Sequence, residues 1–434
     1  MTDLLAARLQ MAFSLGFHII FAEIGVALPV MMTIAEWRWL RTGDEVYLDL
    51  AKRWAKGTAI LFAVGAVSGT ALSFELGLLW PRFMELAGPL IGLPFSLEGF
   101  AFFTEAIFIG VYLYGWDRIS TRMHLAAGVL VALSGAAGTV FVLMVNAWMN
   151  TPVGFEIVNG KLTSIDPLEA LQSAAAFPQA LHMLLAAYAS TGLAVAGVHA
   201  WLLRRDSSST FHRHALAVAL CVGAPAALLQ PLSGDISARL VARTQPVKLA
   251  ALEGQFETER GAPLRLGGIP DEAARQTRWA IEVPRGLSLL AFHDVDAEVR
   301  GLNDFPQDEW PPISIVHASF QLMVALGTAM AVVSLWAVWT AWRHRTLVGR
   351  RHLLAAIAAV APFGFVATEA GWVVTEVGRQ PWVVQGVIRT ADAVTPMPGL
   401  WIPFGVFVGL YVGLAAIVIL LIVALVRETA VATS

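Results

Sequence analysis

The sequence predicts an all-α membrane protein, a bundle of about nine transmembrane helices with the N-terminus outside and the C-terminus inside. Of its 434 residues, 57% are hydrophobic and only 14% are charged, and the mean hydropathy is +0.66. This composition is too apolar for a soluble domain. Nine separate apolar runs, and the alternation of basic residues between them, give the number of helices and their direction.

Each apolar run approaches the roughly 20 residues that cross a bilayer. The first is too long for the apolar core of a cleavable signal peptide, so it predicts a membrane helix. The nine runs are approximately residues 10–36, 56–79, 95–116, 124–149, 178–203, 214–234, 313–342, 353–376 and 397–426.

Arginine and lysine gather in the connections that follow the first, third, fifth and seventh runs. These residues are Arg38, Arg41, Lys52, Arg53, Arg118, Arg122, Arg204, Arg205, Arg213, Arg343, Arg345, Arg350 and Arg351. The other connections are poorer in basic residues, with Arg82, Lys161, Arg379 and Arg389. Because positive connections stay inside, the even-numbered connections are predicted to face outside.

The chain is predicted to divide into helices 1–6 (residues 1–234), an external loop (235–312) and helices 7–9 (313–434). The loop holds 22 of the 61 charged side chains in under a fifth of the length. A connection that long is usually functional or disordered. Its mixed charges and apolar residues favour partial order, with a short helix over Val247 to Glu259.

Composition also excludes several functions. The net charge is only −3, so no polybasic face indicates nucleic-acid binding. The single cysteine, Cys221, excludes a disulfide framework and a CxxCH haem attachment. Any haem would need histidine, methionine or carboxylate ligands.

Polar side chains recur on five predicted helices, all in the half of the bilayer nearer the outside. They are His18, Glu98, His182, Met323 and Glu376. A buried histidine is often a satisfied core residue and a methionine is often packing, but a polar group within a membrane span favours function. His182 and Met323 together would suit a low-spin haem, while His18 and Glu376 are candidates for iron that keeps an open position.

Six other histidines fall beside arginines at the inner helix ends, and we interpret them as cations that reach the inner surface. They are His124, His199, His212, His214, His344 and His352.

The segment from Gly371 to Trp382 reads GWVVTEVGRQPW and closes the eighth run. Glu376 and Arg379 could form an ordinary ion pair at the membrane interface, with tryptophans as anchors. The sequence motif GWxxxExGRQPW, however, resembles the signature near the end of subunit I of the cytochrome bd quinol oxidases, including their cyanide-insensitive branch. That resemblance makes Trp372 and Arg379 candidate catalytic residues.

The resemblance extends along nearly the whole chain. Similar segments are RLQMAFSLGFH (residues 8–18), LEGFAFFTEAIF followed by YGWDR, VNAWMNTPVG, FPQALHMLLAAY, QPVKLAALEGQFET and SFQLMVALG. It implies that His182 and Met323 are the axial ligands of a low-spin haem b. It also implies that His18 is the ligand of a high-spin haem, haem d, and that Glu376 is the ligand of a second high-spin haem, a haem b.

Four further roles follow from the resemblance alone. Glu98 would lie beside the oxygen-reducing haem, and Glu105, two helical turns deeper, on a proton path. Lys248 and Glu253 would contact the quinol, although the alternative for both is a solvated loop charge.

The chain departs from the family pattern at Gln321, where many members carry an arginine, and in its short quinol loop. Both features resemble the cyanide-insensitive branch, so a further haem b in place of haem d stays open.

The expected function is oxidation of quinol at the outer face, coupled to four-electron reduction of O2 to water with protons taken from inside. The resemblance implies a multi-pass protein of the bacterial cytoplasmic membrane, contacting lipid and using ubiquinol or menaquinol. It also implies oxidase subunit II as a partner, with a small single-helix subunit as a further candidate. The rival is a secondary transporter or proton channel, but the sequence shows neither the internal repeat nor the broken helices common in transporters.

Overall fold

The computed structural model describes residues 1–159 and 161–431, and this part of the chain contains nine helical spans long and apolar enough to cross a membrane. The number predicted from the sequence is therefore confirmed. The spans are α1 (Asp3–Thr42), α2 (Glu45–Leu79), α3 (Pro81–Tyr114), α4 (Thr121–Asn150), α6 (Ala176–Arg205), α7 (Thr210–Thr244), α10 (Ile313–His344), α11 with α12 (Arg351–Ala359 and Phe363–Val377) and α14 (Trp401–Val431).

Several helices extend beyond the apolar runs. The side chain of Asp44 caps the first turn of α2, and Pro81 at the first position of α3 starts that helix well before residue 95. Helix ends are thus fixed by capping, whereas hydropathy marks only the apolar part of each helix. As a consequence, Glu98 lies in the middle of α3, whereas the sequence predicted a position near the outer end of that helix.

The eighth span is interrupted. α11 ends at Ala359 and α12 begins at Phe363, with Pro362 at the N-cap of α12. Proline lacks the backbone N–H that would continue the helix, and it disfavours helical geometry in the residue before it. The expectation that no span is broken is therefore wrong here.

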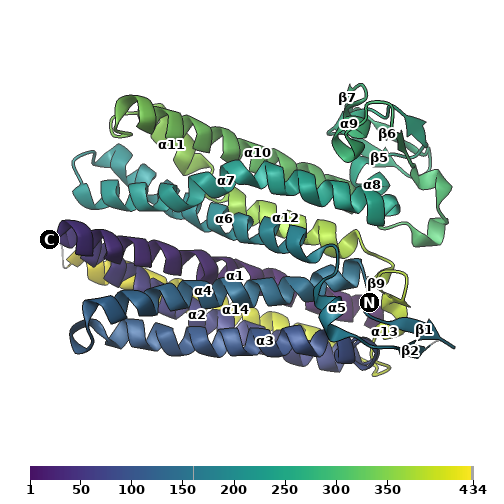
Figure 1. The fold of residues 1–434 in the computed structure, drawn as a ribbon, viewed down its shortest axis with the longest axis horizontal. Coiled ribbons are helices and arrows are strands. Elements are labelled where there is room, and N and C mark those ends of the chain that lie inside the picture. The colour runs from purple at the N-terminus through teal and green to yellow at the C-terminus, as the bar shows by residue number, and fades with distance from the viewer. Residues whose placement is uncertain (160, 432–434) are drawn as a thin grey trace.

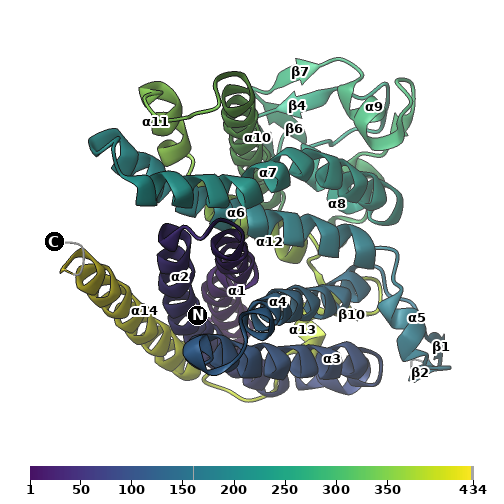
Figure 2. The ribbon, with the colours of Figure 1, turned by 60° about the vertical axis from the view of Figure 1, so that its left-hand side comes forward.

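The helices run roughly parallel to one long axis (Figure 1). One group contains α1, α2, α3, α4 and α14, and the other contains α6, α7, α10, α11 and α12; Figure 2 shows the same grouping after rotation. The N-terminus and the strands lie at one end of the bundle, and the last turns of α14 lie at the other (Figure 1). The loop of residues 235–312 therefore shares an end with the N-terminus, and which end faces outside stays a prediction.

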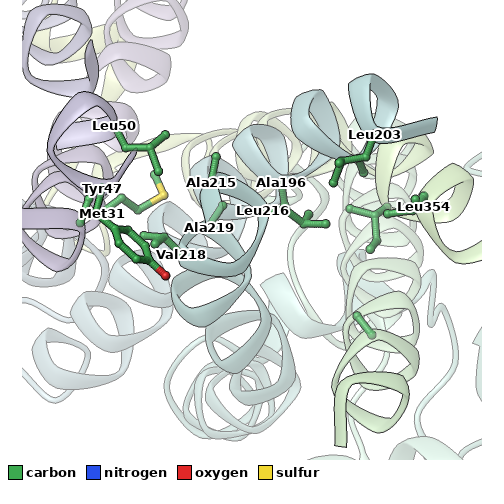
Figure 3. Packing of buried hydrophobic residues seen from close by; sticks show 14 of the residues in the cluster. Met31, Tyr47, Leu50, Ala196, Leu203, Ala215, Leu216, Val218, Ala219 and Leu354 are labelled. Carbon is green, nitrogen blue, oxygen red and sulfur yellow. The ribbon is translucent and has the colours of Figure 1, made fainter. Parts of the chain in front are cut away.

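A buried apolar cluster near the C-terminal end joins the two groups. Met31 on α1 and Leu50 on α2 pack with Ala196 on α6, Ala219 on α7 and Leu354 on α11 (Figure 3). Small residues allow α6 and α7 to approach closely, since a Cβ placed on Gly192 of α6 would lie only 2.5 Å from Cα of Gly223 on α7. These contacts hold the helices in fixed register around the polar residues within the bundle.

The charged loop is ordered. Its first ten residues, 235–244, continue α7, so the connection begins later than predicted. α8 (Pro246–Glu253) follows and is shorter than the predicted helix because Gly254 adopts a left-handed φ of 61°. Three antiparallel pairs then nest within one another: β3 (Glu259–Arg260) with β8 (Glu298–Val299), β4 (Leu264–Leu266) with β7 (Ile281–Val283), and β5 (Ile269–Asp271) with β6 (Gln276–Arg278). The helix α9 (Gly286–Phe292) lies between β7 and β8.

Two side chains on α10 tie this loop to the bundle. Gln321 accepts a hydrogen bond from Gly267 N and donates one to Arg265 O, and His317 Nδ1 lies 2.7 Å from Leu252 O. The residue that departs from the family pattern therefore anchors the loop.

The remaining short elements lie in the connections. They are β1 (Glu156–Val158) paired with β2 (Lys161–Thr163), β9 (Trp382–Val384) paired with β10 (Ile388–Arg389), the helices α5 (Pro167–Leu171) and α13 (Thr390–Ala393), and the 3-10 turns at Trp116–Arg118, Leu302–Asp304 and Gln307–Glu309.

Candidate functional site

His18 lies on α1 with its ring against α2. Its Nδ1 is 2.9 Å from Ser68 Oγ, and that hydroxyl is also 2.9 Å from the carbonyl of Val64 in its own helix. Because the serine hydroxyl donates to the carbonyl, its oxygen accepts from Nδ1–H of His18. The other ring nitrogen, Nε2, therefore keeps its lone pair, which is the form that ligates a metal.

His182 on α6 is held in the same way by α7. Its Nδ1 is 2.9 Å from Ser233 Oγ, which in turn donates to Gln230 O at 2.9 Å. Gln230 Nε2 lies 3.2 Å from His182 Nε2, the nitrogen left with the lone pair.

Each serine is followed by a glycine that lies against the imidazole. A Cβ on Gly69 would be 3.0 Å from Cε1 of His18, and one on Gly234 would be 3.5 Å from Cε1 of His182. Two Ser-Gly pairs on neighbouring helices thus fix the two rings. Sequence reasoning missed them, because serine and glycine are common in membrane helices and only the helix pairing reveals their targets.

Met323 on α10 lies against α12, where a Cβ on Gly371 would be only 2.9 Å from the Met323 sulfur. A larger residue at position 371 would clash with the Met323 sulfur, so glycine allows the thioether to pack there. No hydrogen bond or salt bridge joins His18 with Glu376 in the described part of the chain, and the two side chains reach the bundle from different helices.

Glu376 occupies the last turn of α12, and both of its oxygens are bound. Asn146 Nδ2 on α4 donates to Oε1 at 2.5 Å, and Arg379 Nη2 donates to Oε2 at 2.5 Å. The Arg379 side chain is only 1% exposed, so the pair is not the exposed interfacial pair considered from the sequence. Arg379 Nε and Nη1 and Trp372 Nε1 are buried without hydrogen-bond partners.

These observations fit haem. Unpartnered guanidinium and indole N–H groups suit an anionic group such as a haem propionate, and the glycines let the side chains of His18, His182 and Met323 lie close against the neighbouring helices. Among the described residues no three His, Cys, Asp or Glu side chains converge as a metal cluster. His18, His182 and Met323 lie on separate helices and each offers a single donor atom, which suits a group that takes one or two axial protein ligands.

Lys248 on α8 is buried, contrary to the alternative of a solvated loop charge. Its Nζ donates to Asn150 Oδ1 at 3.2 Å and to the carbonyl of Thr375 at 3.1 Å, so it contacts the residue next to Glu376. Burial and the nearby Arg379 guanidinium lower the pKa of Lys248 to about 7.

Glu253, at the end of α8, is also buried, and its Oε2 has no hydrogen-bond partner. Burial raises the pKa of Glu253 to about 7, and Arg265 opposes the shift. Lys248 and Glu253 thus have different neighbours, one toward α12 and the other toward the strands of the loop.

Glu98 and Glu105 lie two turns apart on one face of α3. Glu105 is 8% exposed, and a Cβ on Gly135 of α4 would lie 3.4 Å from its Oε1. Glu98 is half-buried. Glu105 therefore faces α4, and Glu98 lies on the same face of α3, two turns away.

The interpretation of the inner histidines as surface cations is wrong for His124 and His199, which are 3% and 8% exposed. His124 pairs with the buried carboxylate of Glu36, and His199 Nδ1 lies 3.0 Å from His212 Nδ1. The sequence could not reveal these partners because they come from other helices.

Comparisons with known proteins agree with this geometry. The family described as "Cytochrome bd terminal oxidase subunit I" matches residues 6–430. The chain is 40% identical over 425 residues to the "Putative cytochrome bd menaquinol oxidase subunit I" of Bacillus subtilis (strain 168), covering 96% of this chain and 95% of that protein. It is 32% identical over 408 residues to the "Cytochrome bd ubiquinol oxidase subunit 1" of the same organism, covering 91% and 87%. Its fold matches the solved bd oxidase from Geobacillus thermodenitrificans with a TM-score of 0.92 and 39% identity, over 98% of this chain and 99% of the other.

Proposed function

Because this chain belongs to the cytochrome bd terminal oxidase subunit I family, we propose that quinol binds at its loop of residues 235–312 and is oxidised there, beside the haem-binding end of the bundle. Membership of this family makes the chain a subunit of a terminal quinol oxidase. The chain is a multi-pass membrane protein, and the family implies haem cofactors, a quinol substrate and a multi-subunit oxidase. The alternative of a transporter or proton channel is not favoured.

The proposal assigns each haem by its protein ligands. His182 Nε2 and Met323 Sδ would hold a low-spin haem b, and His18 and Glu376 would hold two high-spin haems, one of them haem d or a further haem b. When bound, the haems supply one-electron redox centres and an iron that binds oxygen. Ser68 and Ser233 keep the histidine ring nitrogens oriented, and Arg379 and Trp372 supply N–H donors for propionates.

The position proposed for the quinol site rests on Lys248, because this residue joins the loop directly to the end of α12 through Thr375 O. Oxidation of each quinol to quinone releases two electrons and two protons, so two quinols supply the four electrons that reduce one O2. Lys248 would donate hydrogen bonds to a quinol oxygen. Glu253, whose Oε2 is unpartnered, would accept a proton as the electrons leave.

The partners follow from the family and its relatives. We propose association with subunit II, and with a small single-helix subunit, in the bacterial cytoplasmic membrane with the loop outside. Either menaquinol or ubiquinol fits the proposal, since relatives named for each match the chain.

The experiment compares His182→Ala and Met323→Leu with the parent oxidase in reduced-minus-oxidised optical spectra. Each variant should lose the low-spin haem signal, because a six-coordinate site needs both axial ligands. An unchanged low-spin spectrum in both variants would refute the pairing. Quinol-dependent oxygen consumption by the parent complex tests the oxidase function itself.

A further inference from the structure

Three polar groups follow each other at seven-residue intervals along α3: Glu98, Glu105 and Tyr112. Seven residues are nearly two helical turns, so all three side chains lie on one face of the helix, about 10 Å apart along its axis. Tyr112 is 1% exposed, and its hydroxyl has no hydrogen-bond partner.

Beyond Tyr112 lies a buried ion pair at the end of the bundle opposite the quinol loop. His124, in the first turn of α4, places Nδ1 2.8 Å from Glu36 Oε1 of α1 and Nε2 2.9 Å from the backbone oxygen of Tyr112. With a carboxyl oxygen on one side and a carbonyl on the other, each ring nitrogen of His124 faces a hydrogen-bond acceptor, and the ring joins α1 to the end of α3. Glu36 is 1% exposed, and its second oxygen, Oε2, is unpartnered.

Aromatic rings cover the pair. The His124 ring centroid lies 3.9 Å from that of Trp116 and 4.4 Å from that of Tyr112. Glu36 and Tyr112 therefore share His124 as a neighbour, one through its carboxyl group and the other through its backbone oxygen and its ring. Among titratable side chains on neighbouring elements, Lys52 of α2 lies on the Trp116 ring, 5.2 Å from its centroid.

The facing helix leaves room for these groups. A Cβ on Gly128 of α4 would lie 2.8 Å from Cε2 of Tyr112, and one on Gly135 would lie 3.4 Å from Glu105. These glycines are also seven residues apart, so α4 presents a glycine opposite Tyr112 and another opposite Glu105. The α3–α4 interface thus combines a row of protonatable groups with a row of positions lacking side chains.

We propose that Glu36, His124 and Tyr112 form the inner end of the proton path that Glu105 and Glu98 continue toward the site of oxygen reduction. This inference rests on the proposed function, in which four protons from inside join four electrons from two quinols to reduce O2 to two waters. A proton from the inner solution binds the Glu36 carboxylate. Tyr112 accepts a proton on its oxygen as it releases its own toward Glu105, so the hydroxyl ends each transfer unchanged. Water molecules join Tyr112, Glu105 and Glu98, since steps of about 10 Å exceed one hydrogen bond.

The test uses the complete oxidase in sealed vesicles, with Tyr112→Phe as the principal variant. Phenylalanine keeps the ring that packs on His124 and Trp116 and removes only the hydroxyl. We expect proton uptake coupled to oxygen reduction to slow by about tenfold or more, with a larger solvent deuterium isotope effect. Haem spectra and the quinol KM should stay unchanged, which a general structural defect would not allow. Tyr114→Phe is the matched control, because Tyr114 is on the same helix but 72% exposed.

Glu36→Gln provides the second variant and should slow proton uptake in the same way. Proton uptake and isotope effects equal to those of the parent in both Tyr112→Phe and Glu36→Gln would overturn the inference while leaving the oxidase function intact. A parent complex that consumes no oxygen with quinol would instead overturn the proposed function, and this inference with it.

Discussion

Replacing the serine behind each histidine should affect one haem and spare the other. Ser233→Ala removes the acceptor 2.9 Å from His182 Nδ1, and Ser68→Ala removes the equivalent acceptor of His18. In each variant a buried Nδ1–H loses its partner, which costs about 1–3 kcal/mol. Loss of such an outer partner typically lowers metal affinity about 10–100-fold, equivalent to about 1.4–2.7 kcal/mol, so the two magnitudes agree.

The assay is haem content and reduced-minus-oxidised spectra of the purified complexes. Ser233→Ala should weaken or shift the low-spin haem signal, whereas Ser68→Ala should act on a high-spin haem. The midpoint potential of the affected haem should rise, because an imidazole without its Nδ1 hydrogen bond is a weaker donor to ferric iron.

Matched controls lie nearby on the same helices. Ser237 and Ser73 bond only to backbone carbonyls of their own helices, Ser233 O and Gly69 O. Their alanine variants should therefore retain normal spectra. If Ser233→Ala and Ser68→Ala match these controls in spectrum and haem content, neither serine positions a ligand and the reasoning fails.

Three further predictions concern the loop and the helix contacts. Lys248→Met should slow quinol oxidation while leaving the haem spectra intact, and quinol kinetics equal to those of the parent would place the quinol elsewhere. Burial raises the pKa of Glu253 to about 7, so its proton-accepting carboxylate form accumulates as the pH rises through 7. The rate of quinol oxidation by the parent should therefore increase over that pH range. Glu253→Gln should oxidise quinol more slowly, and its rate should not increase with pH in this way. Gly192→Ala should destabilise the protein by about 1–3 kcal/mol, because its Cβ would meet the backbone of Gly223 at 2.5 Å. Thermal unfolding in detergent measures this loss against Gly110→Ala, where an added Cβ meets nothing within 4 Å; equal stability of the two would contradict the packing argument.

The number of spans was predictable because hydropathy reports directly on the cost of placing residues in hydrocarbon. The helix ends were not, since Asp44 and Pro81 start α2 and α3 through capping and proline geometry in polar or mixed segments. The break at Pro362 was not predicted, because the apolar run that contains this proline is long enough for one continuous membrane helix.

The candidate ligands could be identified because polar residues are rare within membrane spans and because the motifs resemble a known family. Their supports could not, since a serine that holds a histidine on another helix has no sequence spacing to reveal it. The same limit explains His124, whose partner Glu36 is 88 positions away. The alternative of a solvated charge for Lys248 could not be excluded from the sequence, because the contact of α8 with α12 joins residues 127 positions apart.

The carbon monoxide difference spectrum of Glu376→Gln, recorded beside that of Arg379→Lys, tests most directly whether the end of α12 holds a haem. Glutamine keeps hydrogen bonding but is a far poorer iron ligand than a carboxylate, whereas lysine keeps the positive charge opposite Glu376. The account predicts a lost or altered high-spin haem in Glu376→Gln and a smaller change in Arg379→Lys, which keeps the iron ligand and the positive charge but loses guanidinium N–H donors. Full high-spin haem and full oxidase activity in Glu376→Gln would contradict it.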